Sequence, residues 1–243
     1  MKKIEILYAG GKEIAPYFFE EAQAMKDVGF KVGTQLLDEV EFIIYRGFSI
    51  LNFENYPRHD KLIHKWDNFK KTLRLNEFYK IIKPYSIPTV FIDKLDESTI
   101  KKISIDNKWN KVFIKSPGTS LFAISDTASV WPDTTIEYMK NIYEINKIKG
   151  PFALRKFIDN PEIFYNEKRY WVMKGKPYHP SNEYPDFIIK MSQKIYEFSG
   201  SQYFTMDVAG DYIVEINPGE CSDRGGEVSL DYFVNIFAET FLY

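Results

Sequence analysis

Residues 203–219, with the sequence YFTMDVAGDYIVEINPG, contain the pattern that most constrains the fold of this chain. Two short apolar runs flank Gly210 and Asp211, a pair that is typical of a tight hairpin turn. Side chains two positions apart on a strand point to the same side, so Glu215 and Asn217 face one way, and Asp207 on the partner strand can join them. We therefore expect an antiparallel hairpin that carries three oxygen-bearing side chains.

These polar side chains have two interpretations. Carboxylate and amide oxygens in this number suit Mg²⁺, which proteins bind through a few carboxylates together with phosphate oxygens. Alternatively, they form the polar outer face of an exposed hairpin. The apolar neighbours of Glu215 and Asn217, and the Asn-Pro-Gly ending, favour a metal site made by Asp207, Glu215 and Asn217.

Composition limits the other possibilities. The 243 residues are 44% hydrophobic and 17% aromatic, which is enough for the core of one large domain or two small ones. The formal net charge of -2 gives no support for nucleic acid or an anionic membrane as a partner. Cys221 is the only cysteine, so an internal disulfide is excluded and a cytoplasmic location is expected. No stretch approaches the roughly 20 apolar residues of a membrane-spanning helix.

The apolar periodicity predicts a small α/β unit over residues 1–60. It consists of a buried strand at 4–8, a helix at 16–28, and strands at about 31–37 and 41–45. Residues 60–83 then form an amphipathic helix that is rich in lysine. Its basic face is interpreted as a solvated surface, with a nucleic-acid or membrane surface as the alternative.

The rest of the chain, residues 61–243 including that helix, is predicted to be an α+β domain. The expected strands lie at 111–115, 152–158, 169–173, 203–208 and 212–216, and the expected helices at 134–147, 185–198 and 230–241. Two common nucleotide-binding motifs are absent, the P-loop and the G-x-G-x-x-G fingerprint. The three histidines have no zinc-like partners, and no histidine motif near Cys221 supports a nucleophilic cysteine.

The hairpin resembles the metal-binding motif of the ATP-grasp enzymes, in which an acidic residue on one strand and Glu-x-Asn on the next hold magnesium. Three further segments agree in order with that family. Residues 112–115 resemble the strand whose lysine, here Lys115, reaches the nucleotide phosphates, and 116–120 the flexible loop that follows. Residues 152–158 resemble the hinge strand, and 167–176 the Glu-x-Arg strand that carries Arg169.

The resemblance implies an ATP-grasp fold, in which two α+β lobes grip ATP, preceded by a small α/β pre-ATP-grasp domain over residues 1–60. It implies ATP and Mg²⁺ as cofactors, with Asp207, Glu215 and Asn217 on the metal. The implied nucleotide contacts are Lys71, Lys115, Arg169 and the hinge residues Arg155, Lys156, Phe157 and Ile158. Lys70 is the alternative to Lys71 as the second phosphate-binding lysine. The hinge departs from the family pattern, which usually has Glu or Gln where this chain has Arg155 and Lys156.

The implied activity is ligation of a carboxylate to an amine through an acyl phosphate, with release of ADP and phosphate. Lys115, Arg169 and Arg224 are the candidate catalytic residues. Arg224 would hold the substrate carboxylate or acyl phosphate, and the alternative is an arginine in an exposed loop without a substrate role. Arg46, at the end of the third strand, is a further candidate for substrate contact. The chain is most similar to small ATP-grasp proteins of phages and bacteria that are regarded as peptide or amide ligases, and the acceptor is a small molecule, a peptide or a protein.

Two other functions fit part of the sequence. Lys115-Ser116-Pro117-Gly118 matches the K-x-x-G of nucleotidyltransferases such as polynucleotide ligases, in which the lysine becomes adenylated. The late lysine pair of those enzymes is not evident. A non-catalytic nucleotide-binding module is the third possibility, and the three candidate metal ligands argue against it.

Overall fold

A computed structural model describes residues 3–9, 12–36, 39–48, 55–115, 129–130, 150–158, 160, 163 and 166–243 of the chain. The predicted helix at 134–147 and the predicted loop at 116–120 lie outside these residues. The described strands form three sheets, and helices accompany each of them, so the expected mixture of α/β and α+β structure is confirmed. None of the described helices has the length and apolar character needed to cross a bilayer.

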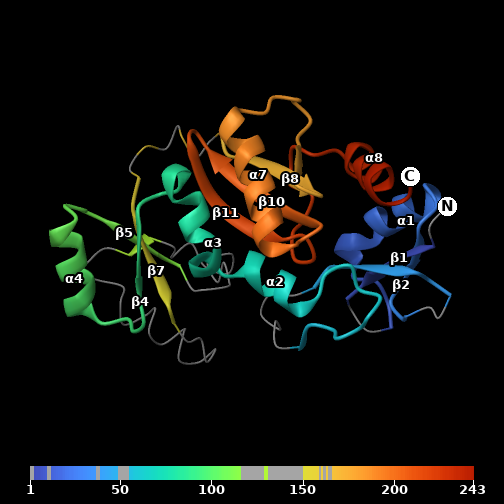
Figure 1. Cartoon of the computed structure of the whole chain (residues 1–243), viewed down its shortest axis with the longest axis horizontal. Coiled ribbons are helices and arrows are strands. Elements are labelled where there is room, and N and C mark those ends of the chain that lie inside the picture. Colours follow the sequence, from blue (N-terminus) through green and yellow to red (C-terminus); the bar gives the residue numbers. More distant parts are fainter. Residues whose placement is uncertain are drawn as a thin grey trace. The chain divides into compact units, whose positions relative to one another are not determined.

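The N-terminal residues form a parallel sheet in the order β2-β1-β3. Its strands are β1 (Ile4–Tyr8), β2 (Lys31–Gly33) and β3 (Phe42–Arg46), joined by the 3₁₀ turn η1 (Pro16–Phe18) and helix α1 (Phe19–Asp27). Every residue of β1 is buried, as expected for a short parallel strand that is covered on both faces. Helix α8 (Leu230–Phe241) lies beside α1 (Figure 1), and both contribute to the core around β1.

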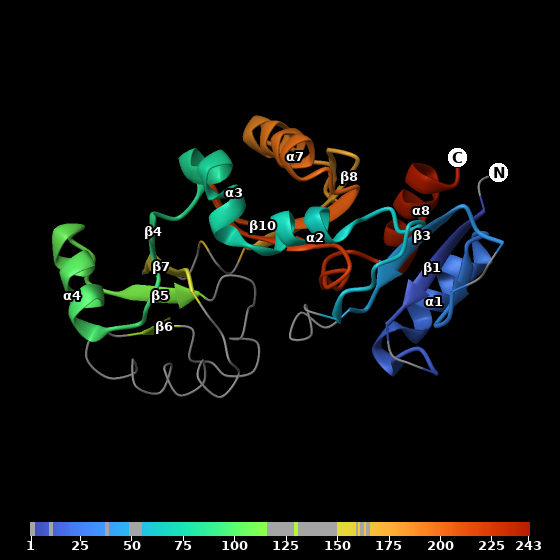
Figure 2. The same cartoon turned by 60° about the horizontal axis from the view of Figure 1, so that its bottom comes forward.

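A second sheet is antiparallel, in the order β4-β7-β5-β6. Its strands are β4 (Thr89–Ile92), β5 (Val112–Lys115), β6 (Ser129–Val130) and β7 (Phe152–Lys156). Helix α4 (Glu97–Asp106), which the sequence analysis did not predict, begins where the Asp96 side chain accepts a hydrogen bond from the Thr99 N–H. It lies beside this sheet (Figure 2) and buries Ile100 in a core with Ile92 and Ile114.

The third sheet is also antiparallel, in the order β11-β10-β8-β9. It contains β8 (Lys168–Met173), β9 (Lys176–Tyr178), β10 (Tyr203–Ala209) and β11 (Tyr212–Pro218), and helix α7 (Asp186–Ser199) contacts β9. The hairpin predicted around Gly210 and Asp211 is therefore present as β10 and β11. Lys174 and Gly175 both have positive φ, 49° and 81°, which suits the tight turn between β8 and β9.

The single helix predicted over residues 60–83 is wrong, because the structure has two helices there. Helix α2 (Trp66–Leu73) is separated from α3 (Leu75–Ile82), and the turn η3 (Lys83–Tyr85) follows. Arg74 is extended, with φ -99° and ψ 111°, and this interrupts the helical hydrogen bonds. The continuous three-and-four spacing of apolar residues hid the break, since both helices are amphipathic.

Contacts divide the chain into two compact units. One comprises Met1–Thr72, Glu167–Val208 and Glu215–Tyr243, and the other comprises Leu73–Asn166 and Ala209–Val214. The break at Arg74 thus falls next to a unit boundary. The sequence analysis predicted a boundary between a pre-ATP-grasp domain and an ATP-grasp domain at residues 60 and 61. That boundary stays a prediction.

Candidate functional site

The hairpin of β10 and β11 presents the predicted metal ligands. Gly210 has a φ of +56°, which the turn requires and which glycine adopts without strain. Asp207 is only 2% exposed although it carries a carboxylate. On β11 the side chains of Glu215 and Asn217 are half-buried, whereas Ile216 between them is buried, as expected from the alternation of a strand.

Arg169 on β8 holds the carboxylate of Asp207. The two residues are directly opposite in the β8–β10 pairing. Arg169 donates from Nε to Oδ1 of Asp207 at 2.7 Å and from Nη2 to Oδ2 at 2.8 Å, a bidentate ion pair, and its Nη1 donates to Asp223. Gly225 lies against the Arg169 side chain, and a Cβ there would be 3.2 Å from Cδ of that arginine.

The charges around Arg169 fix its protonation. Burial by itself would lower the pKa of the guanidinium. The hydrogen bonds and charge of Asp207, with smaller contributions from Asp223 and Glu215, outweigh burial and raise that pKa above its usual value. Arg169 is therefore a permanent cation beside two candidate metal ligands.

The chemistry of this donor set fits Mg²⁺. Two carboxylates and an amide oxygen on neighbouring strands are hard oxygen ligands of the kind that magnesium prefers. Within the described residues no group of three or more His, Cys, Asp or Glu side chains could hold a metal ion, and the predicted set has only two such residues plus Asn217. Asp207 and Arg169 are brought together as partners of each other, which the sequence analysis did not foresee.

The loop after β11 is fixed by a buried arginine. Arg46 is 0% exposed and makes a bidentate ion pair with Glu21, with Nε to Oε1 at 2.9 Å and Nη2 to Oε2 at 2.8 Å. Its Nη1 donates to the carbonyl oxygens of Gly219 and of Ser222, the latter at 2.9 Å. The expectation that Arg46 contacts substrate is wrong, because the folded chain buries this guanidinium. Its role is to connect α1 with the loop that follows Asn217.

A second buried group holds the same loop. Nδ1 of His64 lies 2.6 Å from Oε1 of Glu220, and the Tyr56 hydroxyl donates to the same oxygen at 2.9 Å. Nε2 of His64 accepts the N–H of Tyr203 at 3.2 Å, so the ring hydrogen is on Nδ1 and is donated to Glu220. No local motif signals this group, since 156 residues separate His64 from Glu220.

The predicted hinge residues lie in the compact unit that comprises Leu73–Asn166 and Ala209–Val214. Arg155 is 2% exposed, and its guanidinium donates to the Val214 carbonyl at 2.6 Å and to Oγ of Ser86 at 3.2 Å. The backbone N–H of Lys156 donates to the Pro88 carbonyl at 2.9 Å. The side chain of Arg155 is thus used within the protein, so any adenine contact at this position would come from the backbone.

The predicted hinge residues Phe157 and Ile158, and Lys115, lie in the same compact unit as Arg155. The N–H of Phe157, just after β7, donates to the Lys111 carbonyl, just before β5, at 3.1 Å. Ile158 follows this hydrogen bond. Lys115 ends β5 and pairs with Ala153 on β7, with its side chain half-buried. Their predicted contacts with nucleotide stay predictions.

Comparison with known proteins decides the fold. No protein-family model and no curated protein sequence matches the chain. Among solved structures, D-cycloserine synthetase DcsG is similar with a TM-score of 0.66 and 12% identity over 97% of this chain and 99% of that one. The macrocyclase MdnC from Microcystis aeruginosa MRC, bound with precursor peptide MdnA, gives a TM-score of 0.65 and 12% identity over 99% of both chains. The D-alanine–D-alanine ligase of Bacillus anthracis gives a TM-score of 0.65 and 11% identity over 100% of this chain and 98% of that one.

The chain has the ATP-grasp fold. This confirms the fold expected from the hairpin and the strands upstream of it.

Lys71, the predicted second phosphate-binding lysine, already has a partner within the protein. Its Nζ donates to the Phe198 carbonyl at 3.3 Å and lies 5.4 Å from the centre of the Phe198 ring. The carbonyl of Arg224 accepts the Trp171 indole N–H at 3.1 Å, which orients the loop that carries this candidate substrate ligand.

The sequence analysis did not single out Asp223 and Glu21, which the structure places in contact with Arg169 and Arg46. Asp223 joins Arg169 to the loop, and Glu21 neutralises Arg46. A usable signal existed for Asp223, which lies in the short loop after the Asn-Pro-Gly ending of the predicted metal motif. Glu21 had none, because an acidic residue in the first turn of a helix is ordinarily explained by the helix dipole alone.

Proposed function

We propose that this chain is a Mg²⁺- and ATP-dependent ligase that joins a carboxylate to an amine through an acyl phosphate. The observation that carries the proposal is the bidentate pair of Arg169 and Asp207 next to Glu215, in a fold shared with ATP-grasp ligases. When bound, Mg²⁺ supplies positive charge that neutralises the phosphates of ATP.

The chain's own residues contribute positioning and charge. Arg169 fixes the orientation of the Asp207 carboxylate and remains protonated in the working pH range. Glu215 and Asn217 offer oxygen atoms from one side of β11. Arg46 and the His64–Glu220 pair hold the loop after Asn217 from two sides, which limits its motion. Preorganised ligands of this kind lower the cost of binding a metal and its nucleotide.

Two groups of residues have roles that rest on the family resemblance. Lys71, Lys115 and the hinge residues 155–158 are proposed as nucleotide contacts, and Arg224 as a substrate ligand. The macrocyclase MdnC was solved with its precursor peptide, which supports a peptide as one possible acceptor for this chain as well.

Nucleotide binding tests the metal site directly. Affinity for the ATP analogue AMPPNP is measured calorimetrically with Mg²⁺ and with EDTA, for the wild type, Asp207→Asn and Glu215→Gln. Loss of a supporting contact costs roughly 10–100-fold in metal affinity, so loss of a ligand should reduce the Mg²⁺-dependent affinity at least about tenfold. The matched control is Asp211→Asn, in the exposed turn of the same hairpin, which should bind like the wild type.

Turnover distinguishes the ligase from its alternatives. The protein is incubated with Mg²⁺, a mixture of amino acids and short peptides, and ATP labelled on the α-phosphate. Release of labelled ADP that depends on the added mixture supports the ligase. A stable adduct between the protein and labelled AMP would instead identify a nucleotidyltransferase that uses Lys115. Equal AMPPNP binding with and without Mg²⁺, unchanged in both variants, would identify a non-catalytic module.

A further inference from the structure

Arg169 is shared between two carboxylates. Its Nε and Nη2 donate to the two oxygens of Asp207 at 2.7 and 2.8 Å, and its Nη1 donates to Oδ1 of Asp223. Asp207 lies on β10 and is 2% exposed, whereas the side chain of Asp223, in the loop after β11, is 46% exposed. One guanidinium therefore pairs with a buried carboxylate and with a half-exposed one at the same time.

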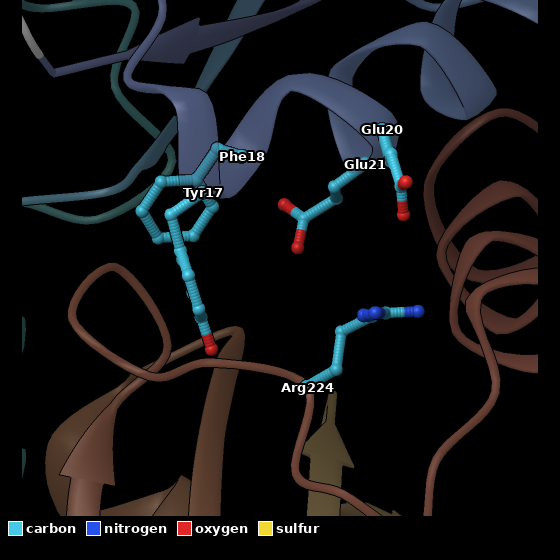
Figure 3. Close-up of a pocket in the computed structure, with 5 residues that line it drawn as sticks. All are labelled: Tyr17, Phe18, Glu20, Glu21 and Arg224. Carbon is cyan, nitrogen blue, oxygen red and sulfur yellow. The ribbon is translucent and has the colours of Figure 1, made fainter.

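Other contacts hold Asp223 in place for Arg169. The N–H of Gly225 donates to Oδ1 of Asp223 at 3.0 Å, and the Tyr17 hydroxyl donates to Oδ2 at 3.3 Å. Figure 3 shows the Tyr17 side chain directed from the N-terminal part of the chain toward the loop that carries Arg224, the residue after Asp223. All of these residues belong to one compact unit. The position of the Asp223 carboxylate is thus fixed by contacts that do not involve Asp207.

Two cations would draw on the carboxylate of Asp207. In the function proposed above Asp207 holds Mg²⁺, and Arg169 already occupies both of its oxygens with hydrogen bonds. The positive charges of the guanidinium and of the metal ion repel each other, and water screens this repulsion poorly at a buried group. The more strongly Arg169 interacts with Asp223, the less it competes with the metal ion for Asp207.

We propose that Asp223 is a positioning residue for the metal site, which draws the guanidinium of Arg169 away from Asp207 and so leaves that carboxylate available to Mg²⁺. The inference rests on the proposed ligase function, because it takes Asp207 as a metal ligand. Within the described residues no three His, Cys, Asp or Glu side chains are grouped closely enough to hold a metal ion. Asp223 is therefore not a third carboxylate ligand beside Asp207 and Glu215, and it acts through Arg169.

Binding of Mn²⁺ without nucleotide tests the inference, with electron paramagnetic resonance reporting the free ion. The signal of interest is the binding that Asp207→Asn abolishes. Asp223→Asn leaves Arg169 with Asp207 alone, so Mn²⁺ should bind about threefold more weakly, the size expected for a half-exposed ion pair. Arg169→Gln keeps an N–H donor for Asp207 but removes the competing charge, so Mn²⁺ should bind about tenfold more tightly.

The double variant Arg169→Gln/Asp223→Asn separates the action through Arg169 from a direct one. Without the guanidinium, Asp223 has no competitor to draw away, so Asp223→Asn should no longer weaken Mn²⁺ binding. An equal loss with and without Arg169 would overturn the inference, in favour of direct attraction between Asp223 and the ion. Asp211→Asn, in the exposed turn of the hairpin, is the matched control and should bind Mn²⁺ like the wild type.

Opposite effects of the two single variants are the decisive result. If Asp223→Asn and Arg169→Gln both weaken Mn²⁺ binding, the ion pair only holds the structure together and the inference is overturned. It is also overturned if the wild type shows no Mn²⁺ binding that depends on Asp207. If AMPPNP binds with Mg²⁺ while the Mn²⁺ results fail, only this inference fails. If the Mn²⁺ results hold but AMPPNP does not bind, the ligase function fails and the role of Asp223 at a metal site remains.

Discussion

Buried charges, and not only apolar side chains, fix the geometry at the scale of single residues. Arg46 illustrates this, because its guanidinium is fully buried and contacts Glu21 and two loop carbonyl oxygens. The centres of three aromatic rings also lie nearby, those of Trp171, Phe233 and Phe18 at 5.1, 5.2 and 5.7 Å. A buried charge of this kind is tolerated only when it is paired and hydrogen-bonded. The ion pair therefore makes the position of the loop conditional on the position of α1.

Removing one partner of this pair should destabilise the protein strongly. We expect Arg46→Met to lower the free energy of unfolding by about 3–5 kcal/mol, because it leaves the carboxylate of Glu21 buried without its counter-charge. Urea denaturation monitored by circular dichroism measures the change. The double variant Arg46→Met/Glu21→Gln, in which the uncompensated charge is gone, should lose less than the single variant. A loss below about 1 kcal/mol in Arg46→Met would contradict the buried pair.

At the scale of elements, the hairpin and the loop after it show what local pattern predicts well. Strand alternation and the turn at Gly210 and Asp211 led directly to β10 and β11, and their polar positions followed from the same alternation. The helix break at Arg74 was not predictable in this way, because the spacing of apolar residues continues across it. The extended residue lies next to the boundary between the two compact units, which falls between Thr72 and Leu73 and which only the tertiary structure shows.

Gly219 provides a test of how tightly the loop packs. A Cβ at this position would overlap the ring of Tyr203, closer than real Cβ contacts allow. We expect Gly219→Ala to lower the free energy of unfolding by about 1–3 kcal/mol, because the buried ring has to shift. Thermal or urea unfolding measures this.

Gly226→Ala is the matched control, since a Cβ at Gly226 would have no heavy atom within 4 Å. It should be close to neutral, within about 0.5 kcal/mol of the wild type. Equal stability of the two variants would mean that the loop is not held against Tyr203. A further loss of Mg²⁺-dependent AMPPNP binding in Gly219→Ala, but not in Gly226→Ala, would connect this packing with the proposed site.

At the scale of the whole molecule, buried tyrosines link stability to pH. Burial, followed by the nearby carboxylate of Glu21, raises the pKa of Tyr8, and burial, followed by Glu220, raises the pKa of Tyr56 and of Tyr203. Above about pH 10, the usual tyrosine value, the unfolded chain releases these protons while the folded chain retains them. The free energy of unfolding should therefore fall as pH rises, by about 1.4 kcal/mol per pH unit for each buried tyrosine.

Urea unfolding between pH 8 and pH 11.5 checks this dependence, and ultraviolet absorbance reports the phenolates. Tyr56→Phe should be less stable at pH 8, since it loses the hydrogen bond to Glu220, yet its stability should decline less steeply above pH 10. Tyr243→Phe, at the exposed C-terminal residue, should follow the wild type. If the phenolate absorbance of all tyrosines appeared while the protein was still folded, the buried hydroxyls would be accessible to solvent. That result would contradict the prediction.

The sequence by itself determined the strands and helices with strong periodicity, the β10–β11 hairpin, and the side on which Glu215 and Asn217 lie. These follow from interactions between residues that are close along the chain, and the family resemblance added the fold. The tertiary structure alone decided that Arg169 pairs with Asp207, that Arg46 is buried with Glu21, and that His64 bonds to Glu220. Their partners are 38, 25 and 156 positions apart. The choice among the available carboxylates depends on which elements pack together, and no local pattern contains that information.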